Sequence, residues 1–418
     1  MTTGVRKSDG IKCRFCGSML EHSFVDLGVS PLCQTHIEPS QLNCMESFYP
    51  LHAYVCSLCF LVQLDEYVKP TEIFSDYAYF SSYSDSWVEH ARSYTESMRE
   101  RLQLGGASLV VEIASNDGYL LQHFKDAGIR AVGVEPAENV AAVAREKGIV
   151  TETKFFGVET ARELLCKYGQ PDLLLGNNVL AHVPDLNDFV AGMSLLLKRG
   201  GTITMEFPHL LRLMKENQFD TIYHEHFSYL SLTTVETVFK HHGLKIYDVE
   251  ELSTHGGSLR IFATHTDIDT QAISKAVSTV REKEGEYGLQ QVETYEQFSS
   301  NVEKTKRDLL SFLIQAREEG KSIVGYGAPG KGNTLLNYCG IRTDFLQYTV
   351  DRNPHKQGRY TPGTRIPILE PERIRATRPD YLLVLPWNLL GEIRKQTAYI
   401  GEWGGKWVVP IPEVKIFT

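Results

Sequence analysis

The sequence predicts a multidomain α/β protein in which a small cysteine-rich module precedes two doubly wound α/β domains. Three observations support this fold class. Two Cys-x-x-Cys pairs lie near the N-terminus, β-branched apolar runs alternate with helical patterns in the middle of the chain, and a strand–glycine-rich turn–helix unit follows near the C-terminus. Alternating strands and helices form parallel sheets that bind ligands at the carboxyl ends of their strands. At 418 residues the chain has room for two or three such domains.

The composition excludes several classes of protein. The hydrophobic share of 42% and the charged share of 23% are those of an ordinary soluble domain. There is no long uncharged apolar run, and the N-terminal "MTTGVRKSDGIKC" has no apolar core of a signal peptide. We therefore expect a cytoplasmic protein without a membrane partner. The net charge of −9 argues against a general nucleic-acid binder, while a local basic pocket for a phosphorylated small molecule remains compatible with it.

Four of the eight cysteines have metal-ligand spacing. "CRFC" and "CSLC" supply Cys13, Cys16, Cys56 and Cys59, and four thiolates suit a tetrahedral zinc ion. A closed four-cysteine site leaves no open coordination position, so we expect a structural zinc. The gap between the pairs exceeds that of a usual zinc ribbon, which predicts an insertion between them. A redox pair or packed thiols are the alternatives, but a redox motif needs only one pair. The remaining cysteines have no such spacing and are expected to be packed thiols: Cys33, Cys44, Cys166 and Cys339.

The first α/β domain begins with "ASLVVEIA", a buried parallel strand, and the turn "SNDG". This turn contains one glycine, Gly118, and lacks the GxGxxG that close approach to a pyrophosphate demands. An adenosine ligand without phosphates makes a weaker demand. Glu135 ends the second strand, about 20 residues after the first turn. A carboxylate at this place can accept hydrogen bonds from both ribose hydroxyls. A generic nucleotide-binding domain is the alternative.

The end of this domain favours one class of cofactor. "LKIYDVEEL" and "GGSLRIFATH" read as two strands joined by a short loop around "STHGG". This resembles the strand pair that closes the sheet of class I S-adenosylmethionine methyltransferases. We therefore expect S-adenosylmethionine to contact the ends of the first, second and fourth strands, at Glu112, Ala114, Asn116, Gly118, Glu135, Asn177 and Asn178.

A second glycine-rich turn competes with the first as a nucleotide site. In "KSIVGYGAPGKGNTLLNYCG", Gly325, Gly327 and Gly330 match GxGxxG between a strand and a helix, and Asp351 lies about 20 residues further on. Lys331 would face a phosphate as a point charge. This loop is either an anion site for a nucleotide-linked substrate or a tight turn for close strand–helix packing. A pyridine-nucleotide oxidoreductase is a further interpretation of the same motif.

Six segments together resemble one known family. The two cysteine pairs, "EIASNDG", "YHEHFSYLS", "HGGSLR" and "GYGAPGKGNTLLNY" occur in this order and span nearly the whole chain. The combination is similar to the nucleotide-sugar C-methyltransferases of deoxysugar biosynthesis. The resemblance implies S-adenosylmethionine-dependent methylation, at C3 or C5, of the carbon next to the C4 ketone of a 4-keto-6-deoxy sugar, usually carried on dTDP. The chain departs from many relatives at Gly330, where they have alanine.

The resemblance also implies site residues. The counterparts of Tyr77, His182, Tyr223, Glu225 and His226 lie around the sugar in the family, and the counterpart of His226 is the favoured base. The four cysteines match the family's zinc ligands. A carbon beside a ketone is a weak acid, so a histidine suits removal of its proton and a tyrosine hydroxyl suits the enolate oxygen. Glu225 would orient an imidazole or a sugar hydroxyl, and His224 receives no role. Further substrate contacts are expected at Tyr79, Ser82, His255, Arg260, Lys331 and Asn333.

The expected domains are a zinc-binding module at 1–75, a methyltransferase domain at 76–266, a helical connector at 267–317 and a C-terminal Rossmann-like domain at 318–418. Two other functions remain open from the residues alone. One is an NAD(P)-dependent oxidoreductase that uses the C-terminal GxGxxG, and the other is a zinc-module RNA methyltransferase. The acidity of the chain and its lack of a Lys/Arg stripe count against the RNA enzyme.

Overall fold

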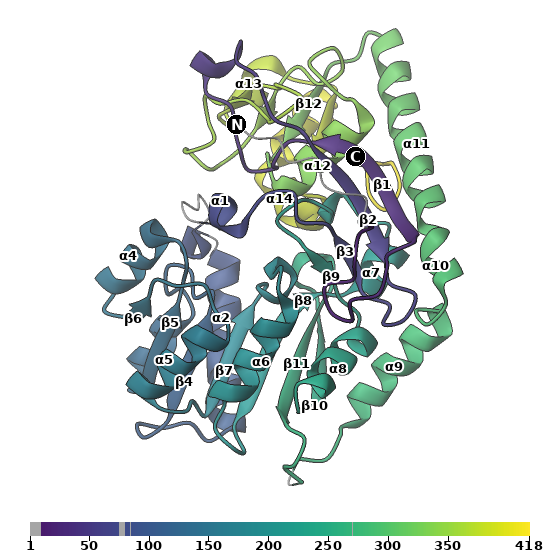
Figure 1. The fold of residues 1–418 in the computed structure, drawn as a ribbon. Helices are drawn as coiled ribbons and strands as arrows, with labels where there is room; N and C mark the ends of the chain where they lie inside the picture. The colour runs from purple at the N-terminus through teal and green to yellow at the C-terminus, as the bar shows by residue number, and fades with distance from the viewer. Residues whose placement is uncertain (1–9, 75–79, 84, 270) are drawn as a thin grey trace. The chain divides into compact units, whose positions relative to one another are not determined.

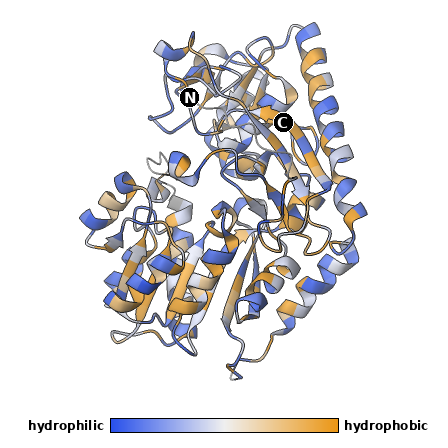
Figure 2. Ribbon diagram, viewed as in Figure 1, coloured by the Kyte–Doolittle hydropathy of each residue, from blue (hydrophilic) through white to orange (hydrophobic). Residues whose placement is uncertain are grey.

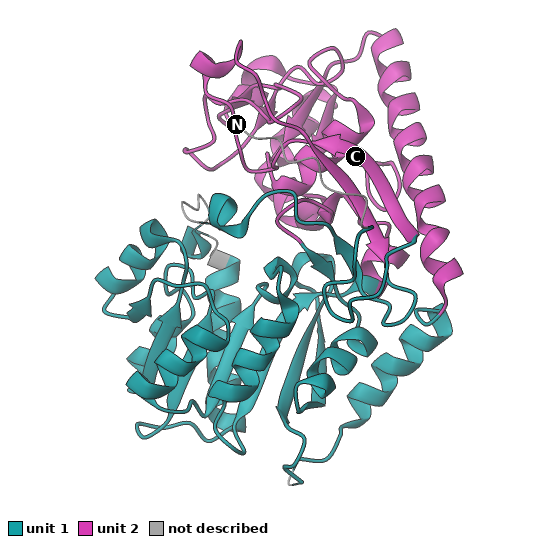
Figure 3. Ribbon diagram, viewed as in Figure 1, with its two compact units in different colours: residues 1–21, 56–210, 227–290 teal, residues 22–55, 211–226, 291–418 magenta. Residues whose placement is uncertain are grey.

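The computed structural model of the chain describes residues 10–74, 80–83, 85–269 and 271–418 (Figure 1). These residues form two compact units, each built from three separate segments (Figure 3). Unit 1 comprises residues 1–21, 56–210 and 227–290, and unit 2 comprises residues 22–55, 211–226 and 291–418. Residues 22–55, which separate the two Cys-x-x-Cys pairs, thus belong to unit 2 and account for the long gap between the pairs. None of the helices within the described ranges combines the length and apolar character needed to cross a membrane.

Unit 1 is built around a seven-stranded sheet with the order β10-β11-β8-β7-β4-β5-β6. The five strands from β8 to β6 pair in parallel, whereas β11 pairs antiparallel with both β8 and β10. This order, with one reversed strand near an edge, is the class I methyltransferase fold that the sequence predicts. The elements of unit 1 are β3 (Val62–Leu64), α1 (Pro70–Phe74), η2 (Ser81–Tyr83), α2 (Asp85–Arg101), β4 (Leu109–Ile113), α3 (Leu121–Asp126), β5 (Arg130–Val134), α4 (Glu138–Glu146), β6 (Val150–Glu152), α5 (Val158–Tyr168), β7 (Leu173–Asn177), η3 (Leu180–His182), α6 (Leu186–Leu196), β8 (Thr202–Pro208), β9 (Ser228–Tyr229), α8 (Leu232–His241), β10 (Leu244–Leu252), η5 (Thr254–Gly256), β11 (Ser258–His265) and α9 (Lys275–Tyr287).

The sequence of the central strands explains their place in the sheet. All five residues of β4 are buried, as are the first four residues of β7 and the first six of β8. Continuous apolar runs suit parallel strands that helices cover on both faces, and Figure 2 shows these strands as mainly hydrophobic. The one carboxylate inside β8, Glu206, breaks this pattern and is wholly buried.

Unit 2 contains a six-stranded sheet with the order β14-β13-β12-β15-β16-β17, parallel except for the edge strand β17. It confirms the predicted C-terminal α/β domain. The hairpin of β1 and β2 belongs to the same unit, where Phe24 of β1 stacks on Phe298 with ring centroids 4.6 Å apart. The elements of unit 2 are β1 (His22–Ser30), η1 (Pro39–Gln41), β2 (Tyr49–Val55), η4 (Phe219–Thr221), α10 (Val292–Glu296), α11 (Phe298–Glu318), β12 (Ile323–Tyr326), α12 (Gly330–Cys339), β13 (Thr349–Val350), β14 (Ile368–Leu369), α13 (Arg373–Thr377), β15 (Tyr381–Val384), η6 (Trp387–Leu389), α14 (Leu390–Gln396), η7 (Ala398–Trp403), β16 (Lys406–Val409) and β17 (Lys415–Phe417), while α7 (Leu210–Lys215) starts on the last residue of the middle segment of unit 1.

Candidate active site and metal centre

The four predicted zinc ligands lie together in unit 1. The sulfur atoms of Cys13, Cys16, Cys56 and Cys59 all lie within 4.8 Å of one another, with separations of 3.6 Å between Cys13 and Cys59 and 3.5 Å between Cys16 and Cys56. Four thiolates on one tetrahedral zinc ion at about 2.3 Å require sulfur separations of this size. The four sulfur atoms therefore fit a zinc ion, and they leave no open coordination position on it for catalysis.

The metal centre is connected to the segment that follows the "YHEH" motif. Gln63 of β3 donates through Nε2 to Cys13 Sγ at 3.2 Å. The same strand pairs antiparallel with β9, in which Ser228 lies opposite Gln63. Leu64 N also donates to Phe227 O at 3.1 Å. A hydrogen bond to a ligating sulfur orients the ligand. Gln63 therefore connects the four-cysteine cluster to the residues directly after His226.

The carboxyl edge of the large sheet carries unusual backbone conformations. Ala114 and Asn116 in the turn after β4, Asn178 after β7 and His255 between β10 and β11 all have φ near +50°. Non-glycine residues adopt this left-handed region at a cost, and such residues cluster at functional sites. Three of these four residues were among the predicted cofactor contacts, and His255 was among the predicted substrate contacts.

Three carboxylates surround the turn after β4. Glu135 accepts hydrogen bonds from Asn116 N at 3.0 Å and Ala137 N at 2.9 Å, and burial raises its pKa to about 7. Glu112 is wholly buried, and neither of its carboxyl oxygens has a hydrogen-bond partner among the described residues. Burial, with the nearby charges of Glu135 and Asp117, raises the pKa of Glu112 well above its ordinary value. A polar ligand at this edge would meet the carboxyl group of Glu112, which its raised pKa favours in the protonated form.

Ser82 and Asn116 each form a hydrogen bond with a sequence neighbour of the other residue. Ser82 Oγ donates to Asp117 Oδ2, and Lys147 Nζ lies 3.3 Å from the same oxygen. Ser81 N donates to Asn116 Oδ1 at 2.8 Å. The short helix η2 is thereby attached to the turn after β4. Tyr77 and Tyr79, the two predicted contacts just before it, lie outside the described residues.

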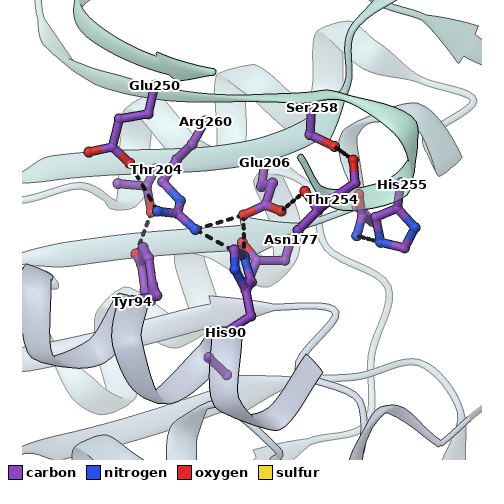
Figure 4. Close-up of polar contacts among 12 residues, drawn as sticks. His90, Tyr94, Asn177, Thr204, Glu206, Glu250, Thr254, His255, Ser258 and Arg260 are labelled. Atoms are coloured by element: carbon purple, nitrogen blue, oxygen red, sulfur yellow. Dashed lines mark hydrogen bonds and ion pairs between the residues drawn. The ribbon is translucent and has the colours of Figure 1, made fainter. Parts of the chain in front are cut away.

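A buried polar network links β8 to the loop that carries His255 (Figure 4). Glu206 Oε2 accepts from Arg260 at 2.8 Å and lies 3.0 Å from His90 Nε2, while Thr254 Oγ1 donates to Glu206 Oε1 at 2.8 Å. Burial alone would raise the pKa of Glu206, but the hydrogen bond from His90 and the charge of Arg260 lower it to about 2. The network therefore holds an ionised carboxylate inside the unit.

Arg260, predicted to bind substrate, lies within this network. Its guanidinium also donates to Glu250 at 3.0 Å and packs 4.7 Å from the centroid of the Tyr94 ring. The structure thus directs Arg260 toward the interior of unit 1. His90 and Glu206 were not singled out from the sequence. The carboxylate in the otherwise apolar strand "GGTITMEFP" was the feature that could have revealed the network.

The other predicted contacts at this edge have neighbours within unit 1. Asn178 Nδ2 lies 2.9 Å from His255 Nε2, and Asn177 Nδ2 lies 3.4 Å from Tyr119 Oη. His182 ends the short helix η3, and its ring makes an edge contact with Phe74 at 5.6 Å. The asparagines and His182 therefore follow β7 at the edge where the turn after β4 also lies.

The "YHEH" residues belong to unit 2. His226 Nδ1 lies 3.0 Å from the carbonyl oxygen of Thr221, and the His226 ring lies 4.1 Å from that of Tyr223, centroid to centroid. A carbonyl oxygen can only accept, so Nδ1 of His226 carries the proton and the neutral ring keeps its lone pair on Nε2. His226 is thus held in the tautomer that a general base requires.

Two neighbouring side chains receive separate roles. His224 Nε2 donates to the carbonyl of Pro50 at 3.1 Å, and burial lowers the His224 pKa, so this ring is a neutral packing residue. Glu225 accepts a hydrogen bond from the thiol of Cys33 at 3.5 Å, and both residues are buried. Burial, reinforced by the charge of Glu225, raises the Cys33 pKa and keeps the thiol protonated as a donor.

The C-terminal glycine-rich turn is in unit 2 as well. Lys331 Nζ donates to Asn388 Oδ1 at 2.9 Å and lies 4.5 Å from the centroid of the Trp387 ring. Asn333 is 1% exposed and donates to the carbonyl of Cys33 at 2.7 Å, so its amide is directed into the unit. Lys331 is the less buried of the two predicted contacts on this turn.

Three family models match successive parts of the chain. The model described as "Putative zinc binding domain" matches residues 13–74, the model described as "Methyltransferase domain" matches residues 88–249, and the model described as "C-methyltransferase C-terminal domain" matches residues 253–412. They cover the metal centre, the seven-stranded sheet and the C-terminal sheet respectively. They agree with zinc and with the methyl donor as the predicted cofactors.

Similarity extends over the full length of a relative. The chain is 36% identical to the C-methyltransferase NovU of Streptomyces niveus over 407 residues, and the aligned region covers 97% of each protein. Among solved structures, a magnesium protoporphyrin IX methyltransferase of Synechocystis PCC 6803 is 17% identical with a TM-score of 0.32 over 43% of this chain and 82% of that one. A methyltransferase of Thermotoga maritima is 17% identical with a TM-score of 0.34 over 45% and 96%. On its family models and its full-length relative, the chain belongs to the C-methyltransferase family.

Proposed function

We propose that this enzyme transfers a methyl group from S-adenosylmethionine to the carbon next to the C4 ketone of a nucleotide-linked 4-keto-6-deoxy sugar, at C3 or C5. The observation that carries the proposal is the 3.0 Å contact between His226 Nδ1 and the carbonyl oxygen of Thr221. The Nδ1–H of His226 is committed to Thr221 O, so Nε2 is the basic nitrogen. A C-methyltransferase requires such a base, because a neutral carbon next to a ketone has no lone pair with which to attack a methyl group.

In the proposed reaction, His226 Nε2 removes the proton from the carbon next to the ketone. The electron pair of the broken C–H bond delocalises onto the ketone oxygen, and the Tyr223 hydroxyl donates to this enolate oxygen as its charge develops. When bound, S-adenosylmethionine would supply the electrophilic methyl group that the enolate carbon takes up, with the electrons of the S–CH₃ bond remaining on sulfur. Glu225, oriented by the Cys33 thiol, holds a hydroxyl of the sugar.

The proposed donor site is the edge of the seven-stranded sheet. Glu135 offers further lone pairs to the ribose hydroxyls beyond its two backbone hydrogen bonds. Asn177 and Asn178 follow β7 at the same edge, where class I sheets bind their ligands. Glu112 is buried directly before the turn, so an ordered water or a donor group of the cofactor would satisfy it.

We also propose that Lys331 contacts a phosphate of the nucleotide, which dTDP would supply. Lys331 stands in the first turn of α12, where free backbone N–H groups favour an anion. Burial lowers the pKa of Lys331, and the charge of Asp220 opposes this change. Lys331→Ala should raise KM for the sugar nucleotide while donor binding stays unchanged.

The acidic residue that an NAD(P)-dependent oxidoreductase would use has structural partners within unit 2. Asp351, the acidic residue expected to bind a ribose in that interpretation, accepts instead from Ala328 N at 2.8 Å and from Asn353 N at 2.8 Å. Oδ2 of Asp351 therefore fixes the glycine-rich turn, and Oδ1 fixes the loop after β13.

The decisive experiment incubates the protein with S-adenosylmethionine and a panel of 4-keto-6-deoxy sugars on dTDP and UDP. Mass spectrometry should find one added methyl group on a sugar, and NMR of the product should place it at C3 or C5. NADH oxidation in place of methylation would favour the oxidoreductase. Methylation of a short RNA would favour the zinc-module RNA methyltransferase.

A further inference from the structure

The glycine-rich motif of the C-terminal sheet has a packing reason at each glycine. A Cβ atom added at any of the three glycines of the GxGxxG motif would lie closer than 3.0 Å to another atom of unit 2. Cβ atoms in proteins essentially never approach other atoms so closely. The atoms that the added Cβ would meet are Thr349 Oγ1 at 2.6 Å for Gly325, Pro386 Cδ at 2.6 Å for Gly327 and Cys33 Sγ at 2.9 Å for Gly330. These contacts give the three glycines a packing role within the unit, beside the role proposed for Lys331.

Helix α12, which this motif begins, packs against the segment before the catalytic tyrosine. Thr334 Oγ1 donates to the carbonyl of Ile222 at 3.1 Å, and Tyr338 makes an edge contact with Phe219 at 5.5 Å. Phe219 and Ile222 are wholly buried. The helix therefore fixes both ends of the stretch from 219 to 222.

That stretch in turn orients His226. Thr221 lies between the two residues that α12 contacts, and its carbonyl accepts from His226 Nδ1. Thr221 Oγ1 donates to Gln218 O at 2.8 Å, which restricts the peptide further. A shift of the Thr221 carbonyl would release Nδ1 and let the ring adopt its other tautomer, in which Nε2 carries the proton and cannot act as a base.

A second contact reaches Glu225 from the same end of α12. Asn333 Nδ2 donates to Cys33 O, and the thiol of Cys33 donates to Glu225. The absence of a side chain at Gly330 allows the Cys33 sulfur to approach. Two neighbouring residues of one helix thus act on two residues of the "YHEH" motif, Asn333 through Cys33 and Thr334 through Ile222 and Thr221.

We propose that the GxGxxG motif and helix α12 are a scaffold for the base, and that Thr334 is the positioning residue that, through the carbonyl of Ile222, holds the adjacent Thr221 carbonyl, and hence His226, in the catalytic arrangement. This inference rests on the proposed role of His226. In this inference the motif serves catalysis by positioning the base and not by binding a dinucleotide.

The test compares Thr334→Val, which removes the hydroxyl at nearly constant volume, with Thr334→Ser, which keeps it. Thr397→Val is the control, because Thr397 is also buried in unit 2 and also donates to a backbone carbonyl, that of Ile393, while its hydroxyl accepts from Trp407 Nε1 as well. Long-range ¹H–¹⁵N spectra of protein labelled at its 14 histidines report the tautomer of each ring. The resonances of His226 are those absent from His226→Gln.

We expect wild type, Thr334→Ser and Thr397→Val to show His226 with an unprotonated Nε2, and Thr334→Val to show a mixture of tautomers. Removing one such hydrogen bond should also lower kcat of methylation about 5-fold, with KM for the sugar little changed. If Thr334→Val keeps the wild-type tautomer, the inference is overturned while the base assignment stands. If wild-type His226 itself carries its proton on Nε2, the proposed base fails, whatever Thr334 does.

Discussion

His90 Nε2 lies 3.0 Å from a carboxylate oxygen of Glu206 that Arg260 also contacts at 2.8 Å. Both members of the Glu206–Arg260 ion pair are almost completely buried, with side-chain exposures of 0% and 6%. A buried ion pair is costly to break from one side, because the remaining charge has no partner and little water. The arrangement therefore makes Glu206 a residue whose charge, more than its volume, supports unit 1.

Replacing Glu206 by glutamine should destabilise the protein by about 3 kcal/mol, because Arg260 loses its buried counter-ion. Chemical denaturation of the variant and wild type measures the difference. The control is Glu250→Gln at the other end of Arg260, whose side chain is 36% exposed and which should cost less than about 1 kcal/mol. Equal stability of Glu206→Gln and wild type would show that the charge is not needed.

Removing a zinc ligand should lower stability and metal content together. We expect about one zinc ion per chain by elemental analysis, and much less in Cys56→Ser, because three thiolates cannot complete the tetrahedral site. Cys44→Ser is the control, since Cys44 lies outside the cluster and is exposed, so the expectation of a packed thiol there was wrong. A native wild-type protein without bound metal would refute the assignment.

Donor binding should depend on Glu135 and on pH. Glu135→Ala should weaken S-adenosylmethionine binding by about 10- to 100-fold, because a hydrogen bond to a charged group is lost. Burial raises the Glu135 pKa to about 7, so the carboxylate becomes protonated as pH falls through neutrality and wild-type affinity should fall between pH 8 and pH 6. Calorimetry measures both effects. The exposed Glu138→Ala should behave as wild type, and unchanged affinity in Glu135→Ala would place the donor elsewhere.

The pair of His209 and Glu284 predicts an acid-sensitive part of unit 1. Glu284 lies 2.7 Å from His209 Nε2 and accepts from two N–H groups in the first turn of α8, those of Leu232 and Thr233. Burial alone would raise the pKa of Glu284, but these hydrogen bonds hold it below its ordinary value.

Because the folded pKa of Glu284 is depressed, its stabilising contribution is fully present above the unfolded pKa, about 4.3, and is lost as pH falls through the lower folded value. Glu284→Gln should therefore lower the free energy of unfolding by about 2 kcal/mol at pH 7 and by less at pH 3. Denaturant titrations at the two pH values check this. Glu286→Gln, exposed on the same helix, should change stability at neither pH. A loss that stays the same at both pH values would mean that ionisation of Glu284 contributes nothing.

Much of the fold could be predicted because local pattern and tertiary structure agree. Apolar runs such as "LVVEI" became buried parallel strands, and the loop "STHGG" joins the antiparallel pair at the sheet edge. The cysteine spacing gave the metal centre, since four thiolates with this spacing have few other uses. The division into units was beyond local pattern, because residues 22–55 and 211–226 pack with segments distant in the sequence.

The candidate site was predictable where a residue type alone suggests its chemistry. It was less predictable where the role of a side chain depends on its partners in the folded protein. His226 was identified as a base candidate, but its tautomer depends on the carbonyl of Thr221, which carries no sequence signature. Arg260 was expected to face a ligand, and only the fold reveals that Glu206 lies opposite it across adjacent strands. Likewise, the thiol of Cys33 meets Glu225 from a position 192 residues away in the chain.

The most direct test of the central claim is exchange of the hydrogen next to the ketone with solvent deuterium. The reaction contains the accepted sugar nucleotide and S-adenosylhomocysteine, which has no methyl group to transfer, so that proton removal is observed alone by NMR. Wild type should exchange this hydrogen, and so should His224→Ala, whose ring is a packing residue. A general base contributes about 10²- to 10⁴-fold, so folded His226→Ala should exchange it slower by that factor. Exchange by His226→Ala at the wild-type rate would contradict the account and make His182 the next base to test.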